Sequence, residues 1–248
     1  MFIFPEDIDL TAGPSTCHRQ FFDLYISQAS RGYIDSLISY QKTLIQRNRL
    51  LKEIARDNSD KRQLDAWDEL LIEDGANIIA ARKVFVDSIA EITQTFYKRF
   101  DNGSLLRIAY MPKIAPDETD IRSALAKLIN TYRQRELKAG VTFVGPHRDK
   151  LDINLNDRPI RHYGSRGQKR CAMIALKLGA AEFLSQTDSG DVILILDEAF
   201  AELDQIKSKA LMEILAGKRQ VFMATAGLFD DCGLMVKRFT FQNGRVSE

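Results

Sequence analysis

Residues 192–204 read Val-Ile-Leu-Ile-Leu-Asp-Glu-Ala-Phe-Ala-Glu-Leu-Asp, and this stretch decides the fold class. Its five leading apolar residues, three of them β-branched, predict a strand buried on both faces, as in a parallel sheet. The strand ends in two adjacent carboxylates, Asp197 and Glu198. Charges beside such a strand are costly unless a cation or a proton-transfer step requires them. A strand that simply ends in solvated acids is the alternative interpretation.

The composition is typical of a globular protein: the 248 residues are 45% hydrophobic and 28% charged, enough for one large domain or two smaller ones. The net charge of +1 neither favours nor excludes a nucleic-acid partner, so any basic surface has to be local. The sequence lacks an apolar run of bilayer length and a signal peptide, which predicts a cytoplasmic protein without membrane contact. A reducing compartment, with neither a disulfide framework nor a zinc site, is indicated by scattered histidines and three isolated cysteines, Cys17, Cys171 and Cys232.

Helical periodicity dominates residues 20–140. Polar residues 57–60 separate two long apolar patterns, and Gly75 leaves open whether the second is one helix or two. Gly140 is a natural helix end. The whole region is expected to form a helical lobe or an antiparallel arm. Its expected elements are helices at about 20–56, 62–100 and 118–138 and a strand at 105–111.

From residue 141 onward, strands and helices alternate, which predicts a largely parallel sheet with helices packed on it. The Asn-Asp pair at 156–157 is turn-prone and separates two short β segments. The expected strands lie at 141–144, 151–155, 159–162, 191–196, 219–224 and near 234–241, and the expected helices at about 165–185 and 204–216.

Residues 163–170, Tyr-Gly-Ser-Arg-Gly-Gln-Lys-Arg, lie directly before an apolar helix. Ser165 is a natural N-cap, and a helix N-terminus binds phosphate well because its backbone N–H groups are unpaired. Gly167 permits close approach of a ligand, while Ser165 and Gln168 add hydrogen-bond donors. An ordinary capped helix is the alternative, but the Lys-Arg pair in its first turn opposes the helix dipole. An anionic partner would explain that pair, and a solvated face is the other open interpretation.

Together the two motifs resemble those of the ATP-binding-cassette ATPases of the SMC-like branch. Ser165–Gln168 resembles the signature motif, Leu194–Glu198 the Walker B strand and Ala201–Asp204 the D-loop, in the order and spacing of that class. Within it the chain is most similar to the RecF family, and the resemblance covers essentially the whole chain. The segments that support it are Phe4–Asp7, Arg19–Asp23, Tyr40 with Gln46–Asn48, and Gly145–Asp149.

The resemblance implies an α/β fold, a partial ABC-type ATPase head with a mainly parallel sheet and flanking helices, plus an inserted helical lobe. Residues 1–19 would be the end of the ATP lobe with the Q-loop region. Residues 20–140 would form the helical lobe, and residues 141–248 the signature, Walker B and D-loop part of the head.

The resemblance also implies a site for ATP and Mg²⁺ at a dimer interface. Asp197 would hold Mg²⁺, and Glu198 would act as the general base. The other subunit would present its signature residues to the γ-phosphate, with Asp204 across the interface. Glu6 and Thr225 are weaker candidates, because many relatives have the Q-loop glutamine and a phosphate-sensing histidine at these places. The implied signature contacts are Ser165, Arg166, Gly167 and Gln168.

Two further groups of residues have open interpretations. His147 and Arg148 follow a Gly-Pro turn, and simple packing is as consistent with the sequence as a position near nucleotide or DNA. A basic run in the helix at 20–56 is a candidate DNA contact, with a solvated helix face as the alternative. Its members are Lys42, Arg47, Arg49, Lys52 and Arg56.

The function implied by the resemblance is recombinational DNA repair and replication, together with the SOS response. ATP-dependent homodimers of this family are expected to bind gapped or duplex DNA through its phosphates, without sequence preference. They are expected to load recombinase together with RecO- and RecR-like mediators.

One motif of the family is absent from the sequence, which has no Gly-x-x-x-x-Gly-Lys-Ser/Thr loop. The resemblance implies that roughly a third of a family-length protein is missing, through truncation, expression of a fragment or a split gene. We therefore expect the chain alone not to hydrolyse ATP. A non-catalytic DNA-binding or interaction fragment is the alternative hypothesis, and open sheet edges are expected to favour non-native association.

Overall fold

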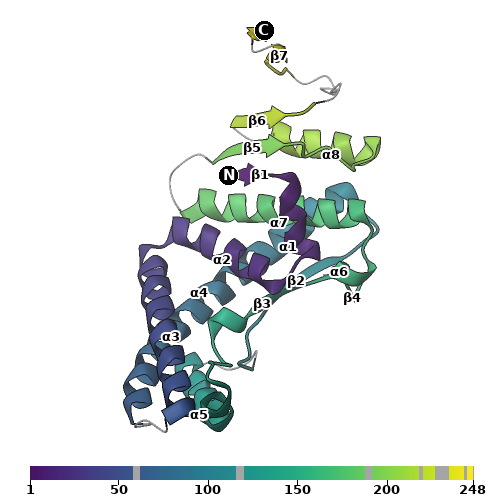
Figure 1. The fold of residues 1–248 in the computed structure, drawn as a ribbon. Helices are drawn as coiled ribbons and strands as arrows, with labels where there is room; N and C mark the ends of the chain where they lie inside the picture. The colour runs from purple at the N-terminus through teal and green to yellow at the C-terminus, as the bar shows by residue number, and fades with distance from the viewer. Residues whose placement is uncertain are drawn as a thin grey trace.

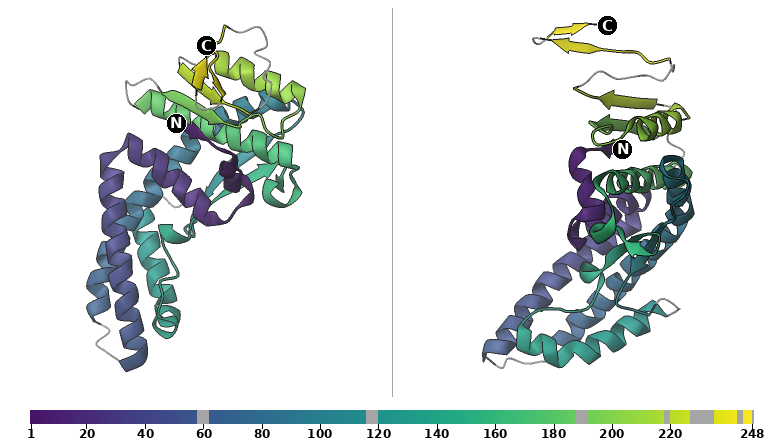
Figure 2. Two further views of the ribbon diagram at one scale, coloured as in Figure 1. Left: turned by 45° about the horizontal axis from the view of Figure 1, so that its top comes forward. Right: turned by 90° about the vertical axis from the view of Figure 1, so that its right-hand side faces the viewer.

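A parallel sheet lies toward one end of the molecule and a bundle of long helices at the other (Figure 1). The computed structural model describes residues 1–57, 62–115, 120–187, 192–217, 220–226, 235–242 and 245–247. We call the bundle the arm; it consists of α3 (Arg31–Asp57), the N-terminal half of α4 (Gln63–Phe100) and α5 (Ile121–Ala139). The remaining helices and strands form the head, and Figure 2 shows the arm leaving the head in both views.

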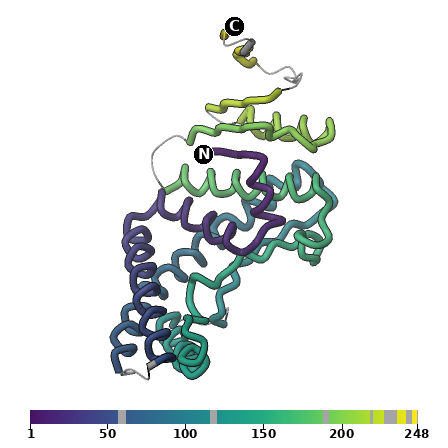
Figure 3. The backbone as a smooth tube through the Cα atoms, in the orientation of Figure 1, coloured from purple at the N-terminus to yellow at the C-terminus, as the bar shows by residue number. Residues whose placement is uncertain are grey.

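The parallel sheet has three strands, in the order β1 (Phe2–Ile3), β5 (Ile193–Asp197) and β6 (Gln220–Ala224). The backbone trace brings the first residues of the chain beside β5, although the two segments are far apart in the sequence (Figure 3). Parallel strands with intervening helices confirm the predicted α/β fold class.

One face of β5 is covered and the other is not. Leu194 and Leu196 are each 1% exposed and belong to the main hydrophobic core, whereas Ile193 on the other face is 42% exposed. The prediction of a strand buried on both faces is therefore wrong for the part of the chain that the structure describes. On the open face lies a row of register partners from the three strands, Phe2, Ile195 and Phe222.

The central helix of the head is α7 (Arg166–Thr187), in which every residue from Arg170 to Ala181 is buried. It packs along α4, where a Cβ on Gly179 would lie 2.6 Å from Thr93 Oγ1. Gly179 therefore permits the close contact that joins the longest helix to the head. The other helices of the head are η1 (Pro5–Ile8), α1 (Asp9–Ala12), α2 (Ser15–Ala29), η2 (Pro146–Arg148), α6 (Ile160–Tyr163) and α8 (Gln205–Ala216).

A second sheet is antiparallel and connects the two halves of the sequence. It contains β2 (Leu106–Met111), β3 (Lys150–Leu155) and β4 (Arg158–Pro159). Asn156 and Asp157 form the β3–β4 turn with φ of 51° and 61°, as in a type I′ hairpin, which confirms the predicted turn. Because β2 pairs with β3, a boundary at residue 140 would divide this sheet. The three-part domain division stays a prediction.

The arm contains the predicted helices with altered limits. α4 is one helix that continues through Gly75, where a Cβ would lie 2.9 Å from Leu125 of α5. α5 ends at Gly140, which has φ of +67°, as a C-terminal glycine predicts. The single helix expected at 20–56 is wrong, because the extended backbone of Ser30 separates α2 from α3.

Residues 141–144 do not form the predicted strand. Side chains of the arm bind their backbone instead: the Thr142 N–H donates to Asn48 Oδ1 (2.8 Å), and the Phe143 N–H donates to Glu136 Oε1 (2.6 Å). The apolar run therefore crosses the arm as an extended, irregular segment rather than as part of a sheet.

Two other predicted strands are displaced. Residues 160–163 form α6, so the strand expected at 159–162 is wrong beyond its first residue. Of the strand expected near 234–241, residues 235–239 are irregular, and β7 (Thr240–Gln242) pairs with β8 (Arg245–Ser247). Residues 58–60 of the predicted polar break, together with Cys232, lie outside the described residues.

Among the helices of the described residues, none combines the length and apolar character that crossing a bilayer requires. Within the same ranges, no group of three or more His, Cys, Asp or Glu side chains is arranged to hold a metal ion. Cys17 and Cys171 are free thiols.

Candidate functional site

The start of α7 carries a capping box formed by Ser165 and Gln168. The Gln168 backbone N–H donates to Ser165 Oγ (3.2 Å), and the Ser165 N–H donates to Gln168 Oε1 (2.9 Å). This reciprocal pair fixes both side chains at the helix N-terminus and confirms the predicted N-cap. It leaves the Ser165 hydroxyl proton and the Gln168 amide protons as donors at a helix end that favours anions.

Glu198 follows β5 in a conformation that few non-glycine residues adopt. Its φ is +46°, in the left-handed region, which costs on the order of 1 kcal/mol. Its backbone N–H donates to the Ala224 carbonyl (3.0 Å), and its Oε1 accepts from the Ala226 N–H (2.6 Å). The carboxylate is therefore held by the backbone just after the end of β6. Thr225, the residue between Ala224 and Ala226, is exposed.

Arg170 supports this strained turn from α7. Its guanidinium donates to the Glu198 carbonyl (2.7 Å) and to the Pro5 carbonyl (3.2 Å), and the residue is only 3% exposed. These contacts explain why a cation lies in the first turn of the helix: it points to carbonyl oxygens of two neighbouring segments. The sequence showed an unexplained cation here but not its partners.

The D-loop region lies against the same end of α7. Arg166 NH1 is 3.6 Å from Glu202 Oε1, and a Cβ on Gly167 would lie 3.6 Å from the Glu202 carbonyl, which is an ordinary contact. Asp204 is the N-cap of α8, because its Oδ1 accepts from the Lys207 N–H (2.9 Å). A role for Asp204 across a subunit interface stays a prediction.

Asp197 is the last residue of β5 and the register partner of Ala224 in β6. A carboxylate oxygen is a preferred ligand of Mg²⁺. Because no cluster of acidic or histidine side chains forms around it in the described ranges, Asp197 fits Mg²⁺ only as one ligand beside phosphate oxygens and water.

The N-terminal segment is tied to the middle of α7 by a contact that sequence reasoning missed. Lys177 is 6% exposed, donates to the Phe2 carbonyl (2.8 Å) and pairs with Asp7. Burial lowers the pKa of the Lys177 ammonium. Glu6, the predicted Q-loop residue, is exposed, and its neighbour Asp7 makes the contact. A single lysine inside the apolar run 171–184 was the signal that could have revealed this pair.

Comparison with known proteins relates this chain to RecF proteins, although no family model matches it. A relative from Moorella thermoacetica, named DNA replication and repair protein RecF, is 34% identical over 225 residues, 91% of this chain and 60% of the relative. A relative of the same name from Bacillus velezensis is 32% identical over 253 residues, 98% of this chain and 68% of the relative.

The chain belongs to the RecF family. A solved structure of the recombination mediator protein RecF-ATP in the RecFOR pathway has a TM-score of 0.85 and 30% identity, covering 100% of this chain and 67% of that chain. A RecF-ATPrS structure gives a TM-score of 0.83 at the same identity. The family resemblance inferred from the motifs is confirmed. The chain spans about 60% of the length of the first curated relatives that it matches.

In this RecF-family chain, His147 and Arg148 lie at the base of the arm. The Tyr40 hydroxyl lies 2.6 Å from His147 Nδ1, and Nε2 lies 3.2 Å from the Thr142 carbonyl. Because a carbonyl only accepts, Nε2 donates to Thr142. Burial lowers the pKa of His147 and so favours the neutral ring, in which Nδ1 accepts from the Tyr40 hydroxyl. Arg148 donates to the same carbonyl (3.2 Å). These bonds favour the packing interpretation, and a contact with nucleotide or DNA stays a prediction.

Asp149 lies two residues after His147, and burial shifts its pKa in the opposite direction. It is 2% exposed and accepts from the Tyr110 hydroxyl. Burial raises the pKa of Asp149 to about 6 and lowers the pKa of His147 to about 4. Relative to the unfolded chain, folding therefore favours the uncharged forms of both side chains.

These shifts predict opposite pH dependence for two variants. Neutral His147 stabilises the fold above its ordinary pKa of 6.5, and this contribution is lost as pH falls toward 4. Protonated Asp149 stabilises the fold below its ordinary pKa of 3.8, and this contribution is lost as pH rises through 6. Between roughly pH 7 and pH 4, the unfolding free energy relative to wild type should fall by up to about 3 kcal/mol for Asp149→Asn and rise by a similar amount for His147→Gln.

Urea denaturation of the wild type and both variants across this pH range measures the difference. Subtracting the wild-type curve removes the titration of all other groups. Two difference curves with the same sign of slope would contradict the assignment.

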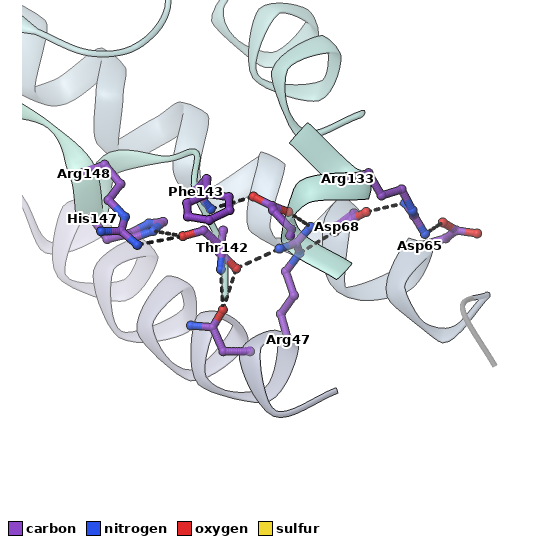
Figure 4. Close-up of polar contacts among 10 residues, drawn as sticks. Arg47, Asp65, Asp68, Arg133, Thr142, Phe143, His147 and Arg148 are labelled. Carbon is purple, nitrogen blue, oxygen red and sulfur yellow. Dashed lines mark hydrogen bonds and ion pairs between the residues drawn. The ribbon is translucent and has the colours of Figure 1, made fainter. Parts of the chain in front are cut away.

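Arg47 lies at the centre of a buried network in the arm (Figure 4). It is 0% exposed, and its guanidinium donates to Asp68 Oδ1 (2.6 Å), Glu136 Oε2 (2.7 Å) and Thr142 Oγ1 (2.7 Å). Arg133 extends the network by donating to Asp68 Oδ2 (2.7 Å). The predicted DNA contact by Arg47 is wrong, because its charge is inside the arm and bound to α4, α5 and the crossing segment.

The other basic residues of this run are exposed on α3. Arg49 pairs with Glu53 (3.0 Å), but both side chains are largely in solvent, so the pair contributes little to stability. Because these basic side chains are exposed, they are available to an anionic partner, and a DNA contact on α3 stays a prediction. The exposed members are Lys42, Arg49, Lys52 and Arg56.

Proposed function

We propose that the chain forms the signature, Walker B and D-loop part of a RecF ATPase that acts in DNA replication and repair. The observation that supports this most strongly is the meeting of the three motifs at one end of α7. Arg170 bonds to the Glu198 carbonyl, and Arg166 lies 3.6 Å from Glu202 in the D-loop. The names of the curated relatives support the cellular role.

ATP is the proposed ligand, bound between two copies of the protein. The start of α7 offers the Ser165 hydroxyl and the Gln168 amide to a γ-phosphate held mainly by the other copy. Arg166, with 88% of its side chain exposed, adds positive charge, and Gly167 keeps a side chain out of the approach. The RecF structure solved with ATP supports this choice of nucleotide.

Glu198 is the proposed general base for hydrolysis. The Ala226 N–H fixes one carboxylate oxygen, so the other can accept the proton of a water that attacks the γ-phosphate. Asp197 would hold Mg²⁺, which when bound neutralises charge on the phosphate oxygens. Asp204 would contact the second copy. Two weaker proposed contacts are exposed residues. Thr225 would contact the γ-phosphate, and Glu6 would contact Mg²⁺ or water.

The proposed assembly is an ATP-dependent homodimer that binds gapped or duplex DNA and loads recombinase together with RecO- and RecR-like mediators. The description of its structural relative as a recombination mediator in the RecFOR pathway supports these partners. Contacts with DNA phosphates would be sensitive to salt and insensitive to sequence. The exposed lysines and arginine of α3, Lys42, Arg49 and Lys52, are one proposed contact.

A pair of substitutions at Ser165 tests the proposed ATP interface. The experiment uses a fusion in which the N-terminal region of a RecF relative, with its Gly-x-x-x-x-Gly-Lys-Ser/Thr loop, precedes this chain; we call it the phosphate-loop fusion. Ser165→Asp keeps an N-cap acceptor but adds negative charge, and should weaken ATP-dependent dimerisation by about tenfold or more. Ser165→Thr keeps the hydroxyl, and should stay within about threefold of wild type.

Sedimentation velocity with and without ATP and Mg²⁺ measures the dimer fraction. Thermal unfolding of both variants serves as the folding control. Dimerisation that does not depend on nucleotide, or that Ser165→Asp leaves intact, would contradict the proposed interface.

A further inference from the structure

A basic surface begins before the signature motif and overlaps it at Arg166, and apart from Arg166 the composite ATP site does not use it. Residues 156–170 contain five lysines and arginines and one acid, Asp157. Figure 1 shows β4 and α6, which carry most of this segment, at the right-hand edge of the head. Tyr163 is 67% exposed among the basic side chains. We call this surface the β4–α6 patch; its exposed members are Arg158, Arg161, His162, Tyr163 and Arg166.

Two of the three arginines of the β4–α6 patch have no acidic partner among the described residues. Asp157 pairs with Arg107 of β2 rather than with the patch. Arg166 has only a long contact of 3.6 Å with Glu202, and Arg158 lies over the Tyr163 ring at 5.6 Å. Neither Arg158 nor Arg161 has an ion pair with the part of the chain that the structure describes.

The backbone under the patch is anchored at both ends by packing and hydrogen bonds. Ile160 is 1% exposed and anchors α6 in the core. A Cβ on Gly164 would lie 2.6 Å from Ile160 Cγ1, so the chain turns tightly between α6 and α7. At the other end, the Asn156 N–H donates to the Leu105 carbonyl (2.9 Å), and the Leu105 N–H donates back to Asn156 Oδ1 (2.8 Å).

We propose that the β4–α6 patch binds the phosphate backbone of DNA, and the choice of DNA over other polyanions rests on the proposed function. Two arginines without an ion pair in the described ranges, together with an exposed tyrosine, match a nucleic-acid strand, because arginines bind phosphates and an aromatic ring stacks on bases or sugars. The patch is an exposed hairpin and helix, which suits an extended polyanion better than a single nucleotide in a cavity.

The patch is adjacent to the proposed ATP site. Tyr163 is two residues before Ser165, and Arg166 belongs to both the patch and the capped helix end. DNA held at Arg158 and Arg161 therefore lies beside the proposed γ-phosphate donors. Binding of DNA and of nucleotide should then affect each other.

The test measures binding of a fluorescein-labelled DNA duplex with a single-strand gap by fluorescence anisotropy, using the 248-residue chain. Arg158→Gln/Arg161→Gln should weaken binding by about tenfold or more at low salt and reduce the slope of log affinity against log salt by roughly two. The matched control is Lys127→Gln/Lys138→Gln on the exposed side of α5, which removes the same charge and should change affinity by less than about threefold.

Two results would overturn the proposal, and they differ in whether the DNA-binding part of the proposed function survives. If the arginine variant binds like the control while Lys42→Gln/Lys52→Gln loses affinity, DNA lies on the arm and only the patch assignment fails. If the wild-type chain does not bind DNA even at low salt, the patch assignment fails together with the DNA-binding part of the proposed function for this chain. Circular dichroism of each variant confirms that binding changes do not come from unfolding.

Discussion

Replacement of Arg47 by alanine should lower the free energy of unfolding by about 3 to 5 kcal/mol. The guanidinium is fully buried and bonds two carboxylates, of which Glu136 is 0% and Asp68 is 6% exposed. Without Arg47, the buried carboxylates of Asp68 and Glu136 either stay charged or take up a proton, and both outcomes cost free energy. Arg133 still donates to Asp68. The Thr142 hydroxyl loses a partner as well.

Urea unfolding followed by circular dichroism measures this loss. The matched control is Arg49→Ala on the same helix, whose exposed pair with Glu53 should contribute less than about 1 kcal/mol. If Arg47→Ala does not fold, Arg47→Lys keeps the charge but not the three-way geometry, and should be measurably less stable than wild type. An Arg47 variant as stable as the Arg49 variant would contradict the buried network.

Replacement of Glu198 by glutamine should reduce ATP hydrolysis by the phosphate-loop fusion about 100-fold or more, within the range of general-base catalysis. Glutamine keeps the size of the side chain and an oxygen that accepts from the Ala226 N–H, but it cannot take the proton of water. ATP-dependent dimerisation should persist, because that contact is assigned to Ser165 and Gln168.

Phosphate release at saturating ATP measures the rate, and sedimentation measures the dimer. Glu213→Gln is the control, since this exposed carboxylate of α8 pairs with Arg99 at the surface, and its loss should leave the rate within about twofold. Hydrolysis that Glu198→Gln leaves unchanged would remove Glu198 from the role of base. Loss of both hydrolysis and dimerisation would indicate a structural role instead.

The parts of the site that the sequence predicted are those with local signals. The helix end at Ser165, the N-cap at Asp204 and the acids at the end of β5 follow from residue type and spacing within a few positions. The contacts of Arg170 and Lys177 were missed because they join the N-terminal segment, more than a hundred positions away, at the Pro5 and Phe2 carbonyls and Asp7. Arg170 also bonds the Glu198 carbonyl, 28 positions further along the chain. A pattern along the chain does not report such partners.

Arg47 shows an error that the sequence itself could have prevented. It was grouped with neighbouring cations, but it lies three residues after Leu44 and four before Leu51, two apolar positions of the helical pattern. The helical period therefore places it on the core side of α3, unlike Lys42 and Arg49. An arginine on that side of a helix indicates a buried ion pair more than a DNA contact.

The misassigned strands had a different cause. The apolar run at 141–144 has strand composition, but Asn48 and Glu136 bind its backbone, so it joins no sheet. β5 has the composition of a strand covered on both faces, yet within the described residues one face is open. Both outcomes depend on which segments are nearby, and strand propensity does not contain that information.

The central claim is that Ser165, Gln168, Asp197 and Glu198 form one part of an ATP site that a phosphate loop must complete. ATP hydrolysis by the 248-residue chain alone, compared with the phosphate-loop fusion, tests it most directly. We predict that the chain alone releases phosphate no faster than its Glu198→Gln variant, and that the fusion is about 100-fold or more faster. Hydrolysis by the chain alone that depends on Glu198, or a fusion no faster than the chain, would contradict the claim.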